Sequence, residues 1–375
     1  MPANGQNTAP VERFRKRVFS PATLIATVIA GMVLALVLWR AFDIDWSQFW
    51  DNARKISPAS YLLALASYYA SFWFRGWRWR LIAKQAFRHT PSAAGKGGAA
   101  AEGPPVKEPK VPGATTLGGI ILMGWFANSV AFLRIGDVYR GWALAKESGA
   151  GAGESLGTVL AERVQDMFAV LILILVAAVW MASTGADVPV VVVIVAFALV
   201  GLIVVMLVVM RFFGLRLAKR LPHRFEKAYG SFQKGTLRSF SPRGLPPQLS
   251  LGIVGWLLEI ARFYFVARGL GVEISFGVVM LVALANAMLT TIPTPGGFGF
   301  VESGIIGLLI FVGLDDTTAL SLTIVDRTIS WVSVVVFGGL LFAFWHLVRD
   351  KRRAVPSPSG SPLGAEGARK AGEGA

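Results

Sequence analysis

The chain contains no cysteine and only three histidines among its 375 residues. The absence of cysteine excludes disulfide bonds and thiolate metal ligands. His89, His223 and His346 are far apart in the sequence and do not have the spacing of a metal-binding cluster. No nucleophile elbow, phosphate-binding loop or dinucleotide fingerprint is present in a suitable context. We therefore expect no metal, no cofactor and no enzymatic activity.

Charge is also scarce, because only 16% of the residues are charged and 54% are hydrophobic. A soluble protein has about 25% charged residues. The apolar residues form long runs, including the 23 uncharged residues of 188–210 and the 19 of 21–39. About 20 apolar residues suffice for a helix to cross a bilayer. The sequence therefore predicts an all-α polytopic membrane protein.

The formal net charge of +15 comes from positive residues that lie beside or between the apolar runs. Of the 37 Lys and Arg residues, 27 fall into four segments, namely 1–20, 75–110, 211–243 and 349–370. Basic loops of membrane proteins face the cytoplasm and attract anionic lipids. We therefore expect anionic membrane lipids as partners, no nucleic acid, and a cell-membrane protein with both termini in the cytoplasm.

This topology predicts about eight hydrophobic helical elements in one membrane domain over residues 21–349. Residues 1–20 form a basic cytoplasmic arm, and residues 350–375 a disordered cytoplasmic tail. Cytoplasmic loops are expected at about 84–116 and 211–246. The aromatic and arginine residues of 74–80 suit an aromatic belt at the membrane interface. Six full spans are predicted at about 22–39, 60–77, 164–181, 188–210, 249–267 and 320–348.

Two further apolar stretches, about 117–147 and 277–313, have to begin and end on the same side of the membrane. They are therefore predicted to be re-entrant hairpins, which are tolerated only where protein or water satisfies the broken backbone. Helix-breaking residues are expected to make the turns. These residues are Gly136, Pro293, Pro295, Gly296, Gly297 and Gly299.

A weak internal repeat accompanies the hairpins. In the first half Asn128 and Asp137 precede the pair Glu162-Arg163, and in the second half Asn286 and Glu302 precede Asp326-Arg327. The two halves enter the membrane from opposite sides. Inverted repeats built on broken helices are typical of transporters, whose site lies at the repeat interface.

The same residues resemble the lysylphosphatidylglycerol synthase transmembrane family, also called flippase-like membrane proteins. The first family motif reads here as Asn128, then Arg134-Ile135-Gly136-Asp137-Val138-Tyr139-Arg140, then Glu162-Arg163-Val164-Gln165-Asp166. The second reads from Pro293 to Glu302, as PTPGGFGFVE. One departure is the missing proline near Phe132 and Leu133. The resemblance implies the lipid-translocating part of such proteins without the appended soluble acyltransferase domain.

Ionisable residues inside a membrane are costly and point to function. Arginine presents a planar fork of donors suited to phosphate. A lipid phosphate is therefore predicted to bind Arg134, Arg140, Arg163 and Arg327, with Asn128 and Asn286 touching substrate or capping broken backbone. Five carboxylates either carry a coupling proton or serve as structural ion pairs, namely Asp137, Glu162, Asp166, Glu302 and Asp326. Glu259 and Arg262 are expected to form an ion pair only with each other, within one helix.

These observations predict a transporter that flips an anionic phospholipid or a lipid-linked phosphate between leaflets. One alternative is a transporter of small solutes or ions on the same architecture. Another is a non-catalytic membrane partner of a separate lipid-modifying enzyme.

Overall fold

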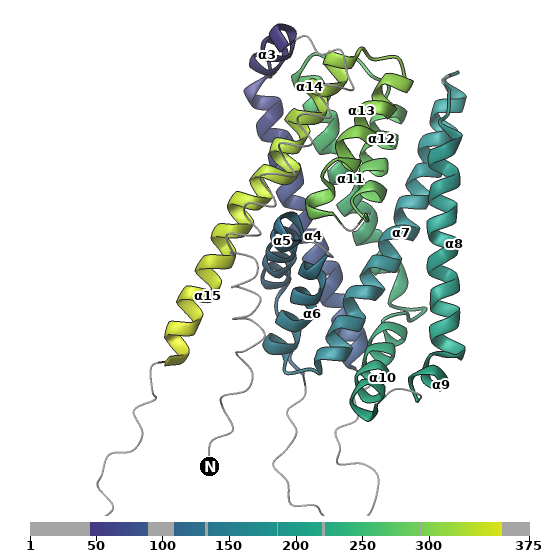
Figure 1. Ribbon diagram of the computed structural model, residues 1–375, viewed down its shortest axis with the longest axis vertical. Coiled ribbons are helices and arrows are strands. Elements are labelled where there is room, and N and C mark those ends of the chain that lie inside the picture. Colours follow the sequence, from purple (N-terminus) through teal and green to yellow (C-terminus); the bar gives the residue numbers. More distant parts are fainter. Residues whose placement is uncertain are drawn as a thin grey trace, which may run out of the picture.

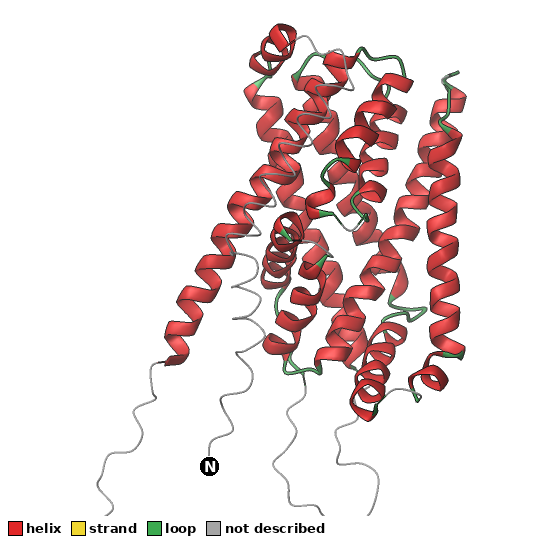
Figure 2. Ribbon diagram, in the orientation of Figure 1, coloured by secondary structure: helices red, strands yellow, loops and turns green. Residues whose placement is uncertain are grey.

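The computed structural model describes residues 46–88, 109–131, 134–185, 187–219, 222–292 and 294–354, and these residues form helices and connecting loops without a strand (Figure 2). Several predicted features lie outside the described residues. They are the basic arm, the span at 22–39, most of the loop at 84–116, Pro293, and the tail beyond residue 354.

The chain order begins with the short helix α3 (Trp46–Arg54) and the long helix α4 (Pro58–Phe87). It continues with α5 (Ala114–Val130), α6 (Ile135–Ser148), α7 (Ala152–Ser183), α8 (Val190–Phe212), α9 (Gly214–Ala218) and α10 (His223–Arg238). The second half contains α11 (Leu245–Gly269), α12 (Phe276–Leu289), the 3-10 turn η1 (Pro295–Gly297), α13 (Phe300–Phe311) and α14 (Asp316–Arg327). Two π-helical stretches, η2 (Thr328–Val332) and η3 (Val334–Gly338), join α14 to α15 (Gly339–Ala354).

Among the described residues, four helical segments are long and apolar enough to cross a membrane. They are α7, α8, α11 and the continuous helix Asp316–Leu347. Shorter apolar helices are α5, α12 and α13. The α-helical membrane fold is therefore supported, whereas the count of six spans stays a prediction. One predicted span lies outside the described residues, and the 30-residue α4, which covers another, is not among the four segments.

The short helices form two pairs in opposite halves of the molecule. Figure 1 shows α5 and α6 in the lower half and α12 and α13 in the upper half, with their turns near mid-height. The turns meet, because the Arg134 guanidinium donates a hydrogen bond to the carbonyl oxygen of Thr290. Each pair therefore covers only part of the length that α7 and α11 cover.

The two turns are built differently. The second uses positive backbone φ angles at Gly296, Gly297 and Gly299, where L side chains are strained. In the first turn the positive φ angle of 49° belongs to Arg134. Gly136 lies instead inside the first turn of α6 and packs against the backbone of Gly124 on α5. The turn of the first pair thus comes before Gly136, and the glycine allows the two helices to approach closely.

Helices α4 and α11 pack antiparallel at the centre of the fold. The amide of Ser57, at the start of α4, donates to the carbonyl oxygen of Gly269, the last residue of α11, over 2.9 Å. At the other end, Gly244 before α11 lies against Gln85 of α4. This central pair carries four of the charged residues described below, namely Arg75, Arg78, Glu259 and Arg262.

Close backbone contact between α4 and α5 predicts a sensitive position at Gly76. A Cβ atom there would lie 2.6 Å from the amide nitrogen of Gly118, a backbone atom that cannot rotate away. Gly76→Val is therefore expected to lower the free energy of unfolding by about 1–3 kcal/mol or more. Thermal unfolding of the purified protein in detergent measures this loss.

Gly201→Val on α8 is the matched control, since a Cβ atom there has no neighbour within 4 Å. It should leave the melting temperature nearly unchanged. Equal melting temperatures for the two variants would contradict the close approach of α4 and α5.

Candidate functional site

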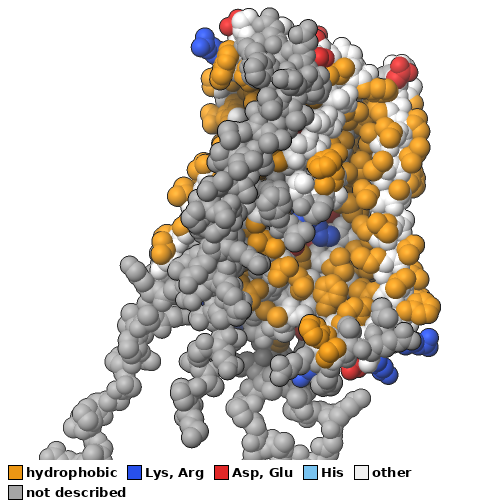
Figure 3. Space-filling model, viewed as in Figure 1, with side chains coloured by type: hydrophobic (Ala, Val, Ile, Leu, Met, Phe, Trp, Pro, Cys, Tyr) orange, Lys and Arg blue, Asp and Glu red, His pale blue; other side chains and the backbone are white. Residues whose placement is uncertain are grey.

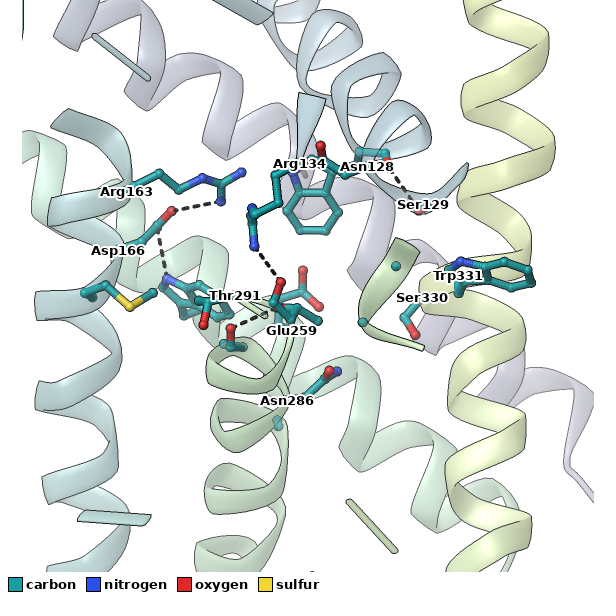
Figure 4. Close-up of a pocket in the computed structure, with 18 of the residues that line it drawn as sticks. Asn128, Ser129, Arg134, Arg163, Asp166, Glu259, Asn286, Thr291, Ser330 and Trp331 are labelled. Atoms are coloured by element: carbon teal, nitrogen blue, oxygen red, sulfur yellow. Dashed lines mark hydrogen bonds and ion pairs between the residues drawn. The ribbon is translucent and has the colours of Figure 1, made fainter. Parts of the chain in front are cut away.

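A cavity of about 350 Å³ lies where the turns of the two short-helix pairs meet (Figure 4). Its walls come from α4, α5, α6, α7, α8, α11, α12, the 3-10 turn η1, and the helix that begins as α14. Arginines outnumber carboxylates on these walls. The arginines are Arg75, Arg134, Arg163, Arg262 and Arg327, and the carboxylates are Asp137, Asp166 and Glu259.

The first half of the chain contributes a cluster centred on α7. Arg78 of α4 reaches Glu162 over 3.1 Å and Asp166 over 2.8 Å. Glu162 also pairs with Arg140. Arg163, on the same helix, pairs with Asp137 of α6 over 2.7 Å. Because the partners come from α4, α6 and α7, these pairs hold the first short-helix pair against the long helices.

The second half contributes a cluster between α11, α13 and α14. Arg262 of α11 pairs with Glu259 over 3.2 Å and with Asp326 of α14. Arg327 pairs with Glu302 of α13 over 2.7 Å and donates to the carbonyl oxygen of Gly296 over 2.9 Å. The other carboxylate oxygen of Glu302 accepts from the Gly299 amide. The second turn is therefore tied to α14 through its backbone.

The two clusters have matching contacts. Asp137 and Glu302 are each the third residue of a short helix, and each pairs over 2.7 Å with an arginine of the following long helix. Each of these arginines directly follows a carboxylate, Glu162 or Asp326, that pairs with an arginine of the central helices. These matching contacts also involve α4 and α11, which were not part of the repeat predicted from the sequence.

Arg75 joins the two clusters. It pairs with Glu259 over 3.4 Å, and its guanidinium lies between the rings of Trp125, at 5.1 Å, and Trp256, at 4.6 Å. The Trp256 indole donates to Asp166 over 3.1 Å. A charge stacked between two aromatic faces is favourable in a desolvated site. The polar network therefore continues from α7 through α4 to α11.

The cluster is positively charged as a whole. Among the described residues these ion pairs form three groups. The group around α7 has four arginines and three carboxylates, whereas the other two groups are balanced, so the sum is +1 when all are ionised. An uncompensated charge in apolar surroundings is unfavourable. An anion bound in the cavity would compensate it.

The clusters differ in exposure. The side chains of Arg134, Asp137 and Arg163 are 27%, 21% and 24% exposed, whereas those of Arg327 and Glu302 are 9% and 3% exposed. The first turn is therefore the accessible part of the network.

The remaining predicted site residues lie at or near the cavity. Asn128 accepts a hydrogen bond from the Gly136 amide over 2.7 Å, so it caps the broken backbone. Asn286 lines the cavity, and its side-chain oxygen has no hydrogen-bond partner within the described part of the chain. Arg140 is fully buried behind the wall against the Trp79 ring. Within the described residues no group of three or more His, Cys, Asp or Glu side chains is arranged to hold a metal ion.

Two interpretations of the sequence are wrong. Arg75 and Arg78 are not anchors at the membrane interface, because they are 2% and 1% exposed and ion-paired. Glu259 and Arg262 do not pair only with each other, because Glu259 also pairs with Arg75 and Arg262 also pairs with Asp326. The sequence did contain a signal for these contacts in both central helices. Arg75 and Arg78 in α4, like Glu259 and Arg262 in α11, are spaced three apart and therefore share one helical face.

Comparison with known proteins places this architecture in a family. The family model for the lysylphosphatidylglycerol synthase TM region matches residues 23–338. The chain belongs to this family. The family model describes a transmembrane region, so membership indicates a multi-pass membrane protein. Membership does not assign an enzymatic activity to this chain.

Two relatives of this chain are UPF0104 membrane proteins. UPF0104 membrane protein MJ1078 of Methanocaldococcus jannaschii is 32% identical over 225 residues, which cover 58% of this chain and 93% of the relative. A UPF0104 membrane protein of Methanothermobacter thermautotrophicus is 30% identical over 242 residues, covering 58% and 70% of the two chains. The family resemblance recognised in the sequence motifs is therefore confirmed.

The pairing of Arg262 with Asp326 predicts a non-additive effect on stability. Arg262→Met leaves Asp326 buried without its arginine and should lower the free energy of unfolding by about 3–5 kcal/mol. Adding Asp326→Leu removes the orphaned charge, while Glu259 keeps Arg75 as a partner. The double variant should therefore be more stable than Arg262→Met alone. Thermal unfolding of the wild type, both single variants and the double variant completes the cycle, and purely additive effects would contradict the pairing.

Proposed function

We propose that the protein moves an anionic lipid between the leaflets of the cell membrane, with the lipid head group in the cavity. The observation that carries the proposal is the excess of arginine over carboxylate around a cavity inside an apolar helical domain. Arginine binds phosphate through paired charge-assisted hydrogen bonds. A volume of about 350 Å³ suits a head group, so the acyl chains would remain in the bilayer.

Access from the side of the molecule supports a lipid over a soluble solute. The partly exposed Arg134, Asp137 and Arg163 belong to the first turn, and the apolar Leu202 of α8, which is 66% exposed, also lines the cavity. Figure 3 shows Lys or Arg atoms at mid-height on one face, with hydrophobic side chains above and below them. A charged opening in an apolar face admits a polar head group whose tails stay outside.

The arrangement of helices suits alternating access. In this proposal α4–α7 and α11–α14 are an inverted repeat, and the two short-helix pairs are re-entrant hairpins from opposite sides. Supporting features are the antiparallel α4 and α11, the matching pairs Asp137–Arg163 and Glu302–Arg327, and the hairpin turns that meet at the cavity. Transporters of this kind place the site at the repeat interface. The basic termini would then face the cytoplasm.

Arg134 offers the sharpest test, because it lines the cavity, is partly exposed and makes few internal bonds. Arg134→Gln should slow the leaflet exchange of an anionic phospholipid by tenfold or more, since one charge-assisted contact contributes about 1.5–3 kcal/mol. Dithionite quenching of acyl-labelled lipid in proteoliposomes measures the rate.

Lys227→Gln is the control for the loss of one positive charge, because Lys227 is exposed on α10 and does not line the cavity. Its rate should match the wild type. Wild-type protein that fails to accelerate exchange of any anionic lipid, or equal rates for the two variants, would contradict the proposed role of the cavity.

A further inference from the structure

We propose that the last helix, Asp316–Leu347, bends at its two π-helical turns, η2 and η3, and that this bend moves Trp331 away from η1 and so opens the cavity. The role of the bend rests on the proposed function, because it supplies a motion that alternating access requires. Three features carry it, namely the position of the π turns between two firmly held parts of one helix, their weak attachment to α4, and the side chains that they present to the cavity.

The middle of the last helix departs from regular α-helical hydrogen bonding. η2 and η3 follow one another, and the amide of Ser333 donates to the carbonyl oxygen of Thr328, five residues back. A π turn is a rare interruption of an α-helix and is frequently found at functional sites. Helices also kink at such turns. Two of them in succession therefore mark the place where this helix bends most easily.

The part of the helix before the π turns is fastened to the second half of the molecule. Asp326 pairs with Arg262 of α11, and Arg327 pairs with Glu302 of α13 over 2.7 Å. All four side chains are buried. Breaking a buried ion pair is costly. The residues of α14 therefore move together with α11 and α13.

The part of the helix from Gly338 onward is held by the first short-helix pair. A Cβ atom at Gly338 would lie 2.8 Å from Cβ of Phe126 on α5, so the two helices approach closely. The Phe342 ring packs against those of Phe126 and Tyr139, with centroids 5.8 and 5.4 Å away. The Tyr139 hydroxyl is hydrogen-bonded to Nε2 of His346 over 3.2 Å. The last helix thus runs from α13 in the upper half to α5 in the lower half, with the π turns between (Figure 1).

Only neutral hydrogen bonds from three tyrosines of α4 hold the π turns by side-chain polar contact with that helix. The hydroxyls of the tyrosines reach two hydroxyls and one backbone carbonyl of the last helix. The pairs are Tyr61 with Oγ1 of Thr328 at 2.9 Å, Tyr68 with the carbonyl oxygen of Ser330 at 3.0 Å, and Tyr69 with Oγ of Ser333 at 2.8 Å.

These tyrosine bonds can be released at little cost to the last helix. The hydroxyls of Thr328 and Ser333 donate to carbonyl oxygens of their own helix, those of Val325 and Ile329. A hydroxyl has one proton to donate, so the tyrosines are the donors to Thr328 and Ser333. When α4 and the π turns separate, the helix therefore keeps its own hydrogen bonds. Since a neutral hydrogen bond contributes less than a charged one, α4 is the weakest polar attachment of this helix.

A bend at the π turns acts directly on the cavity, because Ser330 and Trp331 line it. The Trp331 ring packs edge-on against Phe298, with 4.7 Å between centroids, and a Cβ atom at Gly296 would overlap the indole nitrogen. Figure 4 shows Ser330 and Trp331 on the side of the cavity opposite Arg163. Movement of this part of the helix would therefore separate Trp331 from η1 and widen the cavity on that side.

Distances between spin labels test the bend. The chain has no cysteine of its own, so labels can be attached to introduced cysteines alone. Suitable positions are Phe344 on α15 and Thr115 on α5, which are exposed, and Gly307 on α13, where a Cβ atom has no neighbour within 4 Å. Phe344→Cys with Gly307→Cys spans the π turns. Phe344→Cys with Thr115→Cys lies within the lower part and serves as the control pair.

The pair across the π turns should give two distances in vesicles of phosphatidylcholine and phosphatidylglycerol. They should differ by about 6 Å, because a bend of about 20° acts over the roughly 18 Å of helix from Val332 to Phe344. The control pair should give a single distance. Double electron–electron resonance measures both pairs.

Tyr69→Phe assigns the bend to the contact with α4. It removes the hydrogen bond to Ser333, keeps the ring, and should raise the population of the second distance about two- to tenfold, the factor that one hydrogen bond contributes. Tyr264→Phe on α11 is the matched control. The Tyr264 ring packs against Phe265 and Phe276, but its hydroxyl makes no hydrogen bond with any residue that the structure describes. This variant should keep the wild-type ratio.

The outcomes separate this inference from the proposed function, because lipid exchange is measured in the same vesicles. A single distance across the π turns, or equal changes in both label pairs, would overturn the bend and leave anionic lipid transport standing. Equal ratios for Tyr69→Phe and Tyr264→Phe would overturn the role given to the tyrosines. Two distances in a protein that does not accelerate lipid exchange would overturn the proposed function and, with it, the role of the bend in transport.

Discussion

The burial of arginine is the physical constraint on which the rest of this structure depends. Removing a guanidinium from water is so costly that each one needs carboxylate or aromatic partners at the same depth. Arg78 and Arg262 lie on the central helices and find their carboxylates on α7 and α14, respectively. The central pair therefore determines where the long helices of both halves lie.

The short helices follow from the same constraint. Asp137 and Glu302 sit in the first turns of α6 and α13, where a carboxylate is favoured by the helix dipole. To pair with Arg163 and Arg327, each helix has to begin at the depth of these arginines. The chain must then break between α5 and α6 and between α12 and α13. These breaks open the space that becomes the cavity.

Much of this arrangement was visible in the sequence because it is local. The uncharged runs predicted long helices such as α8, and the glycine-rich segment before Phe300 predicted a break. The approximate repeat of spacing singled out Asp137, Arg163, Glu302 and Arg327, but it did not predict that Asp137 pairs with Arg163 and Glu302 with Arg327. Arg75 and Arg78 were misinterpreted because their surroundings resemble an interfacial belt, and only tertiary packing shows that they point inward. A chain of contacts runs from Arg75 through Glu259 to Arg262 and joins the two halves of the molecule. Arg75 and Glu259 are 184 residues apart in the sequence, so no local pattern reveals their contact.

The central claim is that a lipid head group occupies the cavity between the turns of the two short-helix pairs. Photocrosslinking with a phosphatidylglycerol analogue that carries a diazirine on its head group, followed by peptide mass spectrometry, tests it directly. The account predicts cross-links on α12 and the following turn or on α7, near Asn286 and Asp166, and their loss on addition of unlabelled phosphatidylglycerol. Cross-links confined to the basic surface of α9 and α10 would contradict it.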